Sequence, residues 1–298
     1  HLQPMMSLVT NIEADHMEHY EGDVTRYVQA FNGFLQNLPF YGSAVMCIDD
    51  RGVRDLLPEL TRKVVTYGHH SDADYRLENY RAEGLKSHFD LVCQRTEKTL
   101  PLTVGMPGFH NAQNAAGAAA LCLELGVNES AIKEGLAEFA GVGRRFSDLG
   151  DVRWAGGCAR LIDDYGHHPT EVAVTLKATR EAFPGRRVVM VYQPHRFSRT
   201  RDHFDDFVAV LGESEMLLLL EVYAAGEAAI AGASAEALAQ AIRVRRGVEP
   251  VVVSDQRELA AILIDVLKDR DILLMQGAGD IGRLSATLSD CGSLEVLL

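Results

Sequence analysis

Short apolar runs alternate with amphipathic stretches along most of the chain. Residues 23–37 carry apolar side chains at the spacing of one face of a helix, and two apolar runs joined at Thr96-Glu97 are typical of an antiparallel hairpin. In the first half we predict strands at 7–11, 44–48, 63–67, 87–95 and 98–104, and helices at 23–37, 111–125 and 129–139.

The alternation is more regular in the second half. We predict strands at 160–163, 187–192, 216–220, 250–253 and 271–276, and helices at 170–182, 201–211, 235–242, 256–268 and 281–289. Strands separated by helices are typical of right-handed βαβ units and a parallel sheet. The predicted class is therefore α/β, with a mixed sheet in the first half and a Rossmann-like parallel domain in the second.

Glycines and two arginines at residues 141–146 separate these two patterned regions and predict a linker. A length of 298 residues fits two domains, since a domain averages about 150 residues. We therefore divide the chain into domains at 1–145 and 146–298. Because it begins with His1, we expect the chain to be part of a longer protein.

Composition and charge restrict the function. The hydrophobic fraction of 47% is that of a globular protein, and a net charge of −13 excludes a general nucleic-acid binder. No apolar run approaches the roughly 18 residues of a membrane helix. Five cysteines without a CxxC pair indicate reduced thiols. We expect a soluble cytoplasmic protein. The sequence leaves open whether this protein forms a homodimer.

Ligands of a parallel sheet bind beyond the carboxyl ends of its strands, so the polar residues there carry most of the candidate chemistry. Residues 163–168 (DDYGHH) combine two carboxylates with two imidazoles, and a carboxylate there can hold a ribose. Residues 193–201 bring three arginines and a histidine into an acidic protein, which favours an anion site. The alternative is a cationic rim that offsets the acidic residues 202–206. Residues 221–223 are a further candidate of this kind, because they follow a third predicted strand, 216–220.

Three other motifs each have two interpretations. Residues 11–16 (NIEADH) suit a divalent cation or proton transfer, or a polar loop that caps the next helix. The asparagines of 110–114 suit an adenine edge or a helix cap. The arginines of 141–146 suit a phosphate or an ion pair across the domain interface.

Residues 277–282 match G-x-G-x-x-G, but only sixteen residues follow, too few for a dinucleotide fold. We therefore predict a tight turn that directs a helix N-terminus at an anion. The chain has no G-x-x-x-x-G-K-[ST] phosphate loop.

Six motifs together resemble the Mur ligases, over residues 1 to about 288, and most closely the branch that adds L-alanine. They are TNIEADHM at 10–17, HNAQNA at 110–115, GVGRRF at 141–146, DDYGHHPTE at 163–171, QPHRFSRTRD at 193–202 and QGAGDIG at 276–282. The resemblance implies a ligase of peptidoglycan precursor synthesis that uses ATP and Mg²⁺. It would join L-alanine to UDP-N-acetylmuramate through an acyl phosphate.

The resemblance also implies roles for individual residues. His16 would be a metal ligand near the γ-phosphate, Asn111 and Asn114 would lie at the adenine, Arg144 at a nucleotide phosphate and Asp164 at the ribose. The incoming alanine and the acyl phosphate would be surrounded by Tyr165, His167, His195, Arg196 and Arg199, with the two arginines as clamps for the alanine carboxylate. His16, His167, His195, Arg196 and Arg199 would be the catalytic set.

The chain departs from the family pattern at its beginning. It lacks the UDP-sugar domain, the phosphate loop with its lysine and the glutamate that would share the magnesium ion. We therefore expect residues 1–145 to be the C-terminal part of a central ATP-binding domain and residues 146–298 to be an amino-acid-binding domain. This fragment should have no ligase activity alone. Two alternatives remain: another Mur-type amino-acid or peptide ligase, and a non-catalytic nucleotide-binding module.

Overall fold

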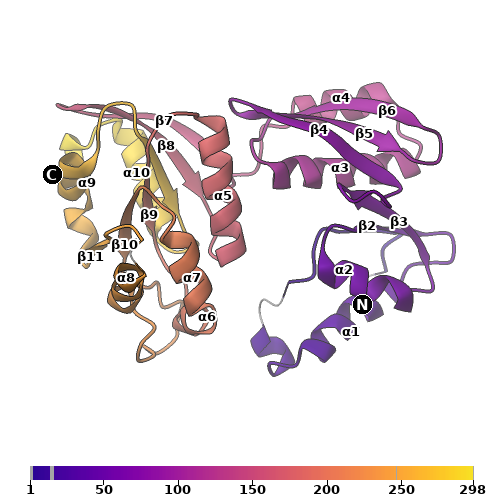
Figure 1. Ribbon diagram of the computed structural model, residues 1–298, viewed down its shortest axis with the longest axis horizontal. Helices are drawn as coiled ribbons and strands as arrows, with labels where there is room; N and C mark the ends of the chain where they lie inside the picture. Colours follow the sequence, from indigo (N-terminus) through magenta and orange to yellow (C-terminus); the bar gives the residue numbers. More distant parts are fainter. Residues whose placement is uncertain (1–2, 14–16, 246, 298) are drawn as a thin grey trace. The chain divides into compact units, whose positions relative to one another are not determined.

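The computed structural model describes residues 3–13, 17–245 and 247–297 and contains two compact units, His1–Phe139 and Ala140–Leu298 (Figure 1). Each unit has a six-stranded sheet with helices packed on it. No helix among the described residues is long and apolar enough to cross a membrane.

The sheet of the first unit follows chain order. Its strands are β1 (Met6–Val9), β2 (Ser43–Cys47), β3 (Lys63–Gly68), β4 (Tyr75–Glu83), β5 (Lys86–Cys93) and β6 (Lys98–Val104). Its helices are α1 (Val24–Gln36), α2 (Arg51–Leu56), α3 (Phe109–Glu124) and α4 (Glu129–Ala137), with short 3-10 turns η1 (Met17–Tyr20) and η2 (Leu57–Glu59). Strands β1 to β4 pair in parallel, whereas β5 is antiparallel to both of its neighbours.

Strand β2 is buried on both faces, which explains its continuous apolar sequence. Val45 packs on the side of the alanine-rich helix α3, and Met46 packs on the side of α1 and α2. Successive side chains of a strand point to opposite faces, so one short strand joins two cores.

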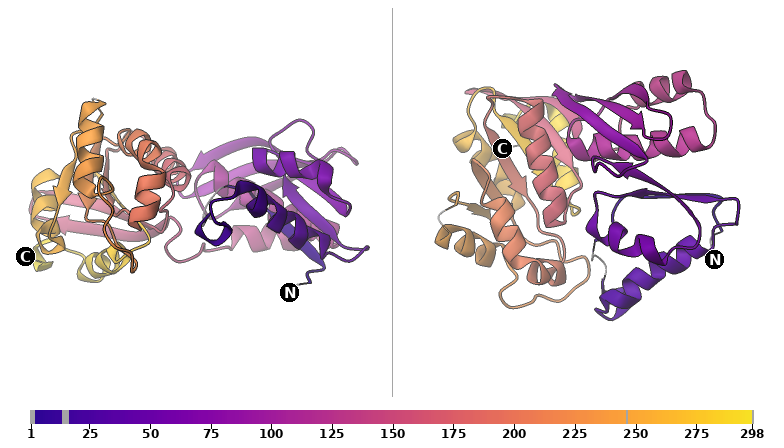
Figure 2. Two further views of the ribbon diagram at one scale, coloured as in Figure 1. Left: turned by 90° about the horizontal axis from the view of Figure 1, so that it is seen from below. Right: turned by 45° about the vertical axis from the view of Figure 1, so that its right-hand side comes forward.

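The second unit has the strand order β11-β10-β9-β12-β8-β7. Its strands are β7 (Ser147–Trp154), β8 (Gly157–Asp164), β9 (Val188–Tyr192), β10 (Met216–Leu220), β11 (Val251–Val253) and β12 (Ile272–Gln276). Its helices are α5 (Pro169–Ala182), α6 (Phe197–Asp202), α7 (Phe204–Leu211), α8 (Ala235–Val244), α9 (Leu259–Val266) and α10 (Ile281–Cys291), with 3-10 turns η3 (Gln256–Glu258) and η4 (Glu295–Leu297). Helices α5, α7 and α8 cover one face of the sheet, and α9 and α10 cover the other (Figure 2).

The prediction of a wholly parallel second sheet is wrong at one edge. Strand β7 pairs antiparallel with β8, so this sheet is mixed like the first. Strands β7 and β4 were not among the predicted strands, and each has an irregularity in its pairing with its neighbour. The predicted helix 201–211 is also two helices, because the backbone of His203 leaves the helical conformation between α6 and α7.

The order of the strands places four loops at the same edge of the second sheet. Strands β8, β12, β9 and β10 are parallel neighbours, so their carboxyl ends lie side by side. The loops that follow them contain the DDYGHH, GAGDIG and QPHRF motifs and residues 221–227. This edge is where ligands of such sheets bind.

Candidate functional site

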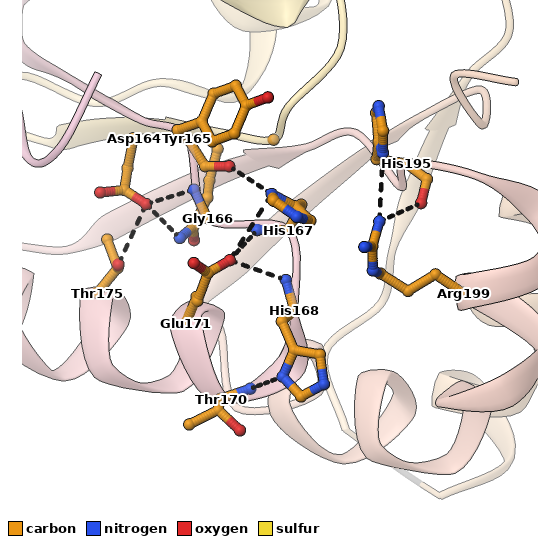
Figure 3. Close-up of polar contacts among 12 residues, drawn as sticks. Asp164, Tyr165, Gly166, His167, His168, Thr170, Glu171, Thr175, His195 and Arg199 are labelled. Carbon is orange, nitrogen blue, oxygen red and sulfur yellow. Dashed lines mark hydrogen bonds and ion pairs between the residues drawn. The ribbon is translucent and has the colours of Figure 1, made fainter. Parts of the chain in front are cut away.

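The loop after β8 is fixed by the carboxylate of Asp164, which is only 5% exposed (Figure 3). Its Oδ1 accepts hydrogen bonds from the Gly166 N–H at 2.8 Å, Gln276 Nε2 at 2.8 Å and Thr175 Oγ1 at 3.3 Å, and its Oδ2 accepts one from the Phe146 N–H at 2.9 Å. These contacts give Asp164 a structural role at the centre of the site. Its predicted contact with a ribose stays a prediction.

Arg144 lies in an ion pair within the second unit, and not in one across the domain interface. Its Nε donates to Asp163 Oδ2 at 3.0 Å, and its Nη2 donates to the carbonyl oxygen of Gly277 at 2.6 Å. The guanidinium also lies over the ring of Tyr165, at 5.1 Å from its centroid, and occupies the space that a Cβ at Gly282 would need. Arg144 therefore ties two of the loops together, and its predicted contact with a phosphate stays a prediction.

Gln193, which follows β9, contacts the GAGDIG turn. The N–H of Ile281, at the start of α10, donates to Gln193 Oε1 at 3.0 Å. Gln193 is buried, and its Nε2 donates to Asp280 Oδ1 at 2.6 Å. A side chain of the protein thus accepts one N–H of the helix start, and the predicted anion at this turn stays a prediction.

The start of α5 orients His167. Pro169 begins the helix, where its lack of an N–H costs no hydrogen bond, and His168 caps it. Glu171 accepts the N–H groups of His167 at 2.8 Å and of His168 at 3.1 Å. Burial raises the pKa of Glu171, but these two donors, the imidazole of His167 when it is protonated and a hydrogen bond from Arg145 outweigh it, so the pKa lies below the usual value. Glu171 is thus a carboxylate at neutral pH.

His195 is the third residue after β9, and its ring lies 5.6 Å from the ring of His167. Arg199 Nη1 lies 3.3 Å from His195 Nδ1 (Figure 3). A guanidinium only donates hydrogen bonds, so Nδ1 must carry the lone pair and Nε2 the proton. Burial lowers the pKa of His195 to about 4, helped by the nearby imidazole of His167 when that ring is protonated and by the charges of Arg199 and Arg196. The imidazole is therefore neutral at physiological pH.

His167 has the opposite tautomer when it is neutral. Its Nδ1 lies 3.1 Å from the carbonyl oxygen of Tyr165, which only accepts hydrogen bonds. The proton is therefore on Nδ1 and the lone pair on Nε2. The two histidines thus combine a proton acceptor with a hydrogen-bond donor, next to the guanidiniums of Arg196 and Arg199. Such a group can bind an anion and accept a proton from a nucleophile.

The structure thus brings together the predicted residues Tyr165, His167, His195, Arg196 and Arg199 in the second unit. Two residues without a predicted role join them, Tyr223 and Glu227, and both follow β10. The ring of Tyr223 is stacked on His195, and Glu227 contacts Arg196 and Ser198. The position of Tyr223 at the carboxyl end of a predicted strand was a signal for it, whereas nothing in the local sequence indicated Glu227.

The predicted adenine contacts lie in the first unit, on α3. Asn114 is exposed, and Asn111 donates its amide to the carbonyl oxygen of Pro107 at 2.7 Å. Asn111 does not cap the helix, because the N-cap position belongs to Gly108, whose φ of 94° suits glycine. Nearby, Asp49 accepts the N–H groups of His69 and His70 and thereby orders the loop after β3.

The predicted metal ligand His16 lies outside the described residues. Residues 3–13, 17–245 and 247–297 contain no group of three histidine, cysteine, aspartate or glutamate side chains that could hold a metal ion.

Comparison with known families gives two matches. Residues 1–122 match the sequence model of the Mur ligase middle domain, and residues 144–279 match that of the Mur ligase glutamate ligase domain. The matched regions include β1 to β6 of the first unit and β7 to β12 of the second.

Solved structures show the same fold. The chain is similar to UDP-N-acetylmuramate-alanine ligase from Thermotoga maritima, at 27% identity and a TM-score of 0.77, over 97% of this chain and 60% of that one. It is also similar to MurF ligase from Thermotoga maritima in complex with ADP, at 16% identity and a TM-score of 0.72, over 99% of this chain and 63% of that one. A murein peptide ligase from Psychrobacter arcticus shares 20% identity at a TM-score of 0.65, over 98% of this chain and 58% of that one.

The second and third of these likenesses establish the fold alone. In each case the chain spans less than two thirds of the length of its relative. With a middle domain followed by a glutamate ligase domain, the chain belongs to the Mur ligase family.

Proposed function

We propose that this chain is part of a cytoplasmic, ATP-dependent ligase that joins L-alanine to UDP-N-acetylmuramate. The observation that carries the proposal is the group formed by His167, His195 and Arg199 at the carboxyl edge of the second sheet. The likeness to the alanine ligase at 27% identity supports the choice of substrates. In this proposal Asn111 and Asn114 of the first unit contact the adenine of ATP, and Mg²⁺ stays a prediction.

The reaction divides into two steps. The carboxylate of the nucleotide sugar attacks the γ-phosphate of ATP and forms an acyl phosphate, and ADP leaves. The amine of L-alanine then attacks the acyl carbon, and inorganic phosphate leaves with the electrons of the broken C–O bond. Both steps depend on positioning and on stabilised negative charge more than on covalent catalysis by the protein.

The described residues supply what the second step requires. Arg196 and Arg199 bind the carboxylate of alanine, since guanidinium–carboxylate pairs are strong and directional. The Nε2–H of His195 donates a hydrogen bond to an oxygen of the acyl phosphate, and its neutrality leaves no extra positive charge to repel the ammonium of alanine. Nε2 of His167 accepts the proton that the amine loses.

The test is phosphate release from ATP in the presence of UDP-N-acetylmuramate. The protein is this chain joined to the N-terminal segment of the Thermotoga maritima alanine ligase, and the acceptors are L-alanine, glycine, L-serine and the tripeptide of murein recycling. The Thermotoga enzyme and this chain alone are the controls, and binding of ATP and the nucleotide sugar shows that the chimera is assembled.

Release with a preference for L-alanine supports the proposal. Release with the tripeptide alone overturns it in favour of a peptide ligase. A chimera that binds both nucleotides but releases no phosphate with any acceptor overturns it in favour of a non-catalytic nucleotide-binding module.

A further inference from the structure

One loop, residues 221–227, holds the short segment that carries three of the predicted site residues. The N–H of Tyr223 donates to the carbonyl oxygen of Pro194 at 2.8 Å, and the N–H of Arg196 donates to the carbonyl oxygen of Tyr223 at 2.8 Å. These two bonds form a parallel bridge between His195 and Tyr223. The backbone of the 221–227 loop therefore sets where His195 lies.

The side chain of Tyr223 lies nearly parallel to the imidazole of His195. The two rings are stacked, with centroids 5.6 Å apart and an angle of 11° between their planes. Tyr223 is 40% exposed, so the hydrophobic core does not require it. Tyr223 also lies close to Gly279, where a Cβ would lie only 2.7 Å from the Cβ of Tyr223. Tyr223 thus contacts both the ring of His195 and the glycine turn.

Glu227 fixes the beginning of α6. It accepts the N–H of Ser198 at 2.9 Å and the Ser198 hydroxyl at 2.6 Å, and it lies 3.8 Å from Arg196 Nη1. The N-cap residue of α6 is Arg196, and its side chain makes no capping hydrogen bond. Glu227 therefore substitutes for a cap and also directs the guanidinium of Arg196.

We propose that Tyr223 and Glu227 are positioning residues for the amino-acid end of the site. Tyr223 holds the ring of His195 so that Nδ1 receives Arg199 and Nε2–H points at the substrate. Glu227 holds Arg196 and the first turn of α6, and through that turn the direction of Arg199. This assignment rests on the proposed function for its consequences in catalysis, but its structural part can be tested without any ligase activity.

The first experiment is NMR of the ¹⁵N-histidine-labelled chain, in which His195→Gln identifies the signals of His195. The charged and titratable groups that face this ring are His167, Arg199, Arg196, Glu227 and Tyr223. We expect a single Nε2–H tautomer in the unsubstituted chain. In Tyr223→Leu the signals should shift towards an average of both tautomers, whereas Tyr223→Phe, which keeps the flat ring, should retain the original pattern.

Tyr41→Leu is the matched control, because Tyr41 is an exposed tyrosine of the first unit. It should leave the signals of His195 unchanged. If folded Tyr223→Leu keeps the single tautomer of the unsubstituted chain, the role assigned to Tyr223 is wrong. Loss of the signature in Tyr223→Phe as well would also overturn it, because the hydroxyl and not the stacked ring would then be responsible.

The second experiment compares KM values in the chimeric ligase, in which this chain is joined to the N-terminal segment of the Thermotoga maritima enzyme. This chimera is called the assembled ligase below. Glu227→Gln keeps an acceptor for Ser198 but removes the charge beside Arg196, so the apparent KM for L-alanine should rise about tenfold with little change in that for ATP. Glu249→Gln, which removes an exposed carboxylate that pairs with Arg243, should change neither KM.

Equal rises in both KM values, or no rise in either, would overturn the role of Glu227. The two proposals fail in distinguishable ways. An unsubstituted ligase that releases no phosphate contradicts the proposed function, while the tautomer of His195 in the Tyr223 variants still decides the role of Tyr223.

Discussion

Arg199 and Arg196 come from the same turn of the chain but have different surroundings. Arg199 is 7% exposed and contacts His195 through Nη1, while the side chain of Arg196 is 35% exposed and lies near Glu227. A buried guanidinium has lost its water and binds an anion more strongly than an exposed one. We therefore expect Arg199 to dominate the binding of the amino-acid carboxylate.

Replacement of Arg199 by alanine should weaken the binding of L-alanine much more than the binding of ATP. We expect Arg199→Ala to raise the apparent KM for L-alanine by about 10- to 100-fold in the assembled ligase, and that for ATP by far less, since one charge-assisted contact is lost. Arg199→Lys keeps the charge without the fork of donors and should have an intermediate effect. Equal increases for alanine and ATP would contradict this role.

The backbone of Arg196 predicts a difference in stability between two variants. Its φ of 69° lies in the region that favours glycine. Arg196→Gly should therefore unfold with a free energy about 1 kcal/mol higher than Arg196→Ala, because relief of strain outweighs the greater chain entropy of glycine. The fluorescence of Trp154, the only tryptophan and a buried residue of β7, reports this in urea. A more stable alanine variant would show that the conformation is not strained.

At the scale of elements, helix α3 packs on its sheet through small residues. Gly117 faces the buried ring of Tyr67 on β3, and a Cβ there would lie 2.5 Å from Tyr67 Cζ. Only glycine lets the helix approach the strand this closely. Gly135 of α4 differs, because a Cβ there would meet nothing within 4 Å.

These two helical glycines form a matched pair for a stability test. Gly117→Ala should lower the stability of the first unit by about 1–3 kcal/mol through overpacking. Gly135→Ala should raise the stability of α4 by about 0.5–1 kcal/mol, since alanine is the better helix former. Hydrogen exchange of the β3 and α4 amides measures both effects. A rise in stability in both variants would contradict this prediction, because it would mean that α3 moves away from the sheet without loss of free energy.

At the scale of the whole second unit, His195 makes stability depend on pH. Burial and neighbouring positive charges lower its folded pKa to about 4, compared with 6.5 for an unperturbed histidine. Between these values the unfolded chain binds a proton that the folded unit does not bind. The free energy of unfolding must therefore fall as the pH falls from 6.5 towards 4.

Comparison with His195→Gln isolates this effect from that of the other histidines. The unsubstituted chain should lose about 1–2 kcal/mol more than the variant over that range, a value reduced for solvent screening at a half-buried group. Urea unfolding followed by Trp154 at a series of pH values measures it. Parallel stability curves for the two proteins would show that the pKa of His195 is not lowered.

Much of the fold could be predicted because burial requires apolar residues at periodic positions along the sequence. The strand at 216–220 was predicted with the bounds that the structure shows, since a strand buried on both faces is continuously apolar. The half-exposed strands β4 and β7 have a weaker pattern of apolar residues, and neither was predicted. The loops of the site were predicted because the carboxyl ends of parallel strands meet at one edge.

The sequence by itself determined that the chain is α/β, that its second half contains βαβ units, and which loops carry polar chemistry. Only the tertiary structure decided which polar side chains are used internally and which belong to the site. Gln276 reaches Asp164 across 112 residues, and Arg144 reaches Gly277 across 133. Periodicity records whether a side chain is buried, but a hydrogen bond between distant residues depends on where the folded backbone places both partners.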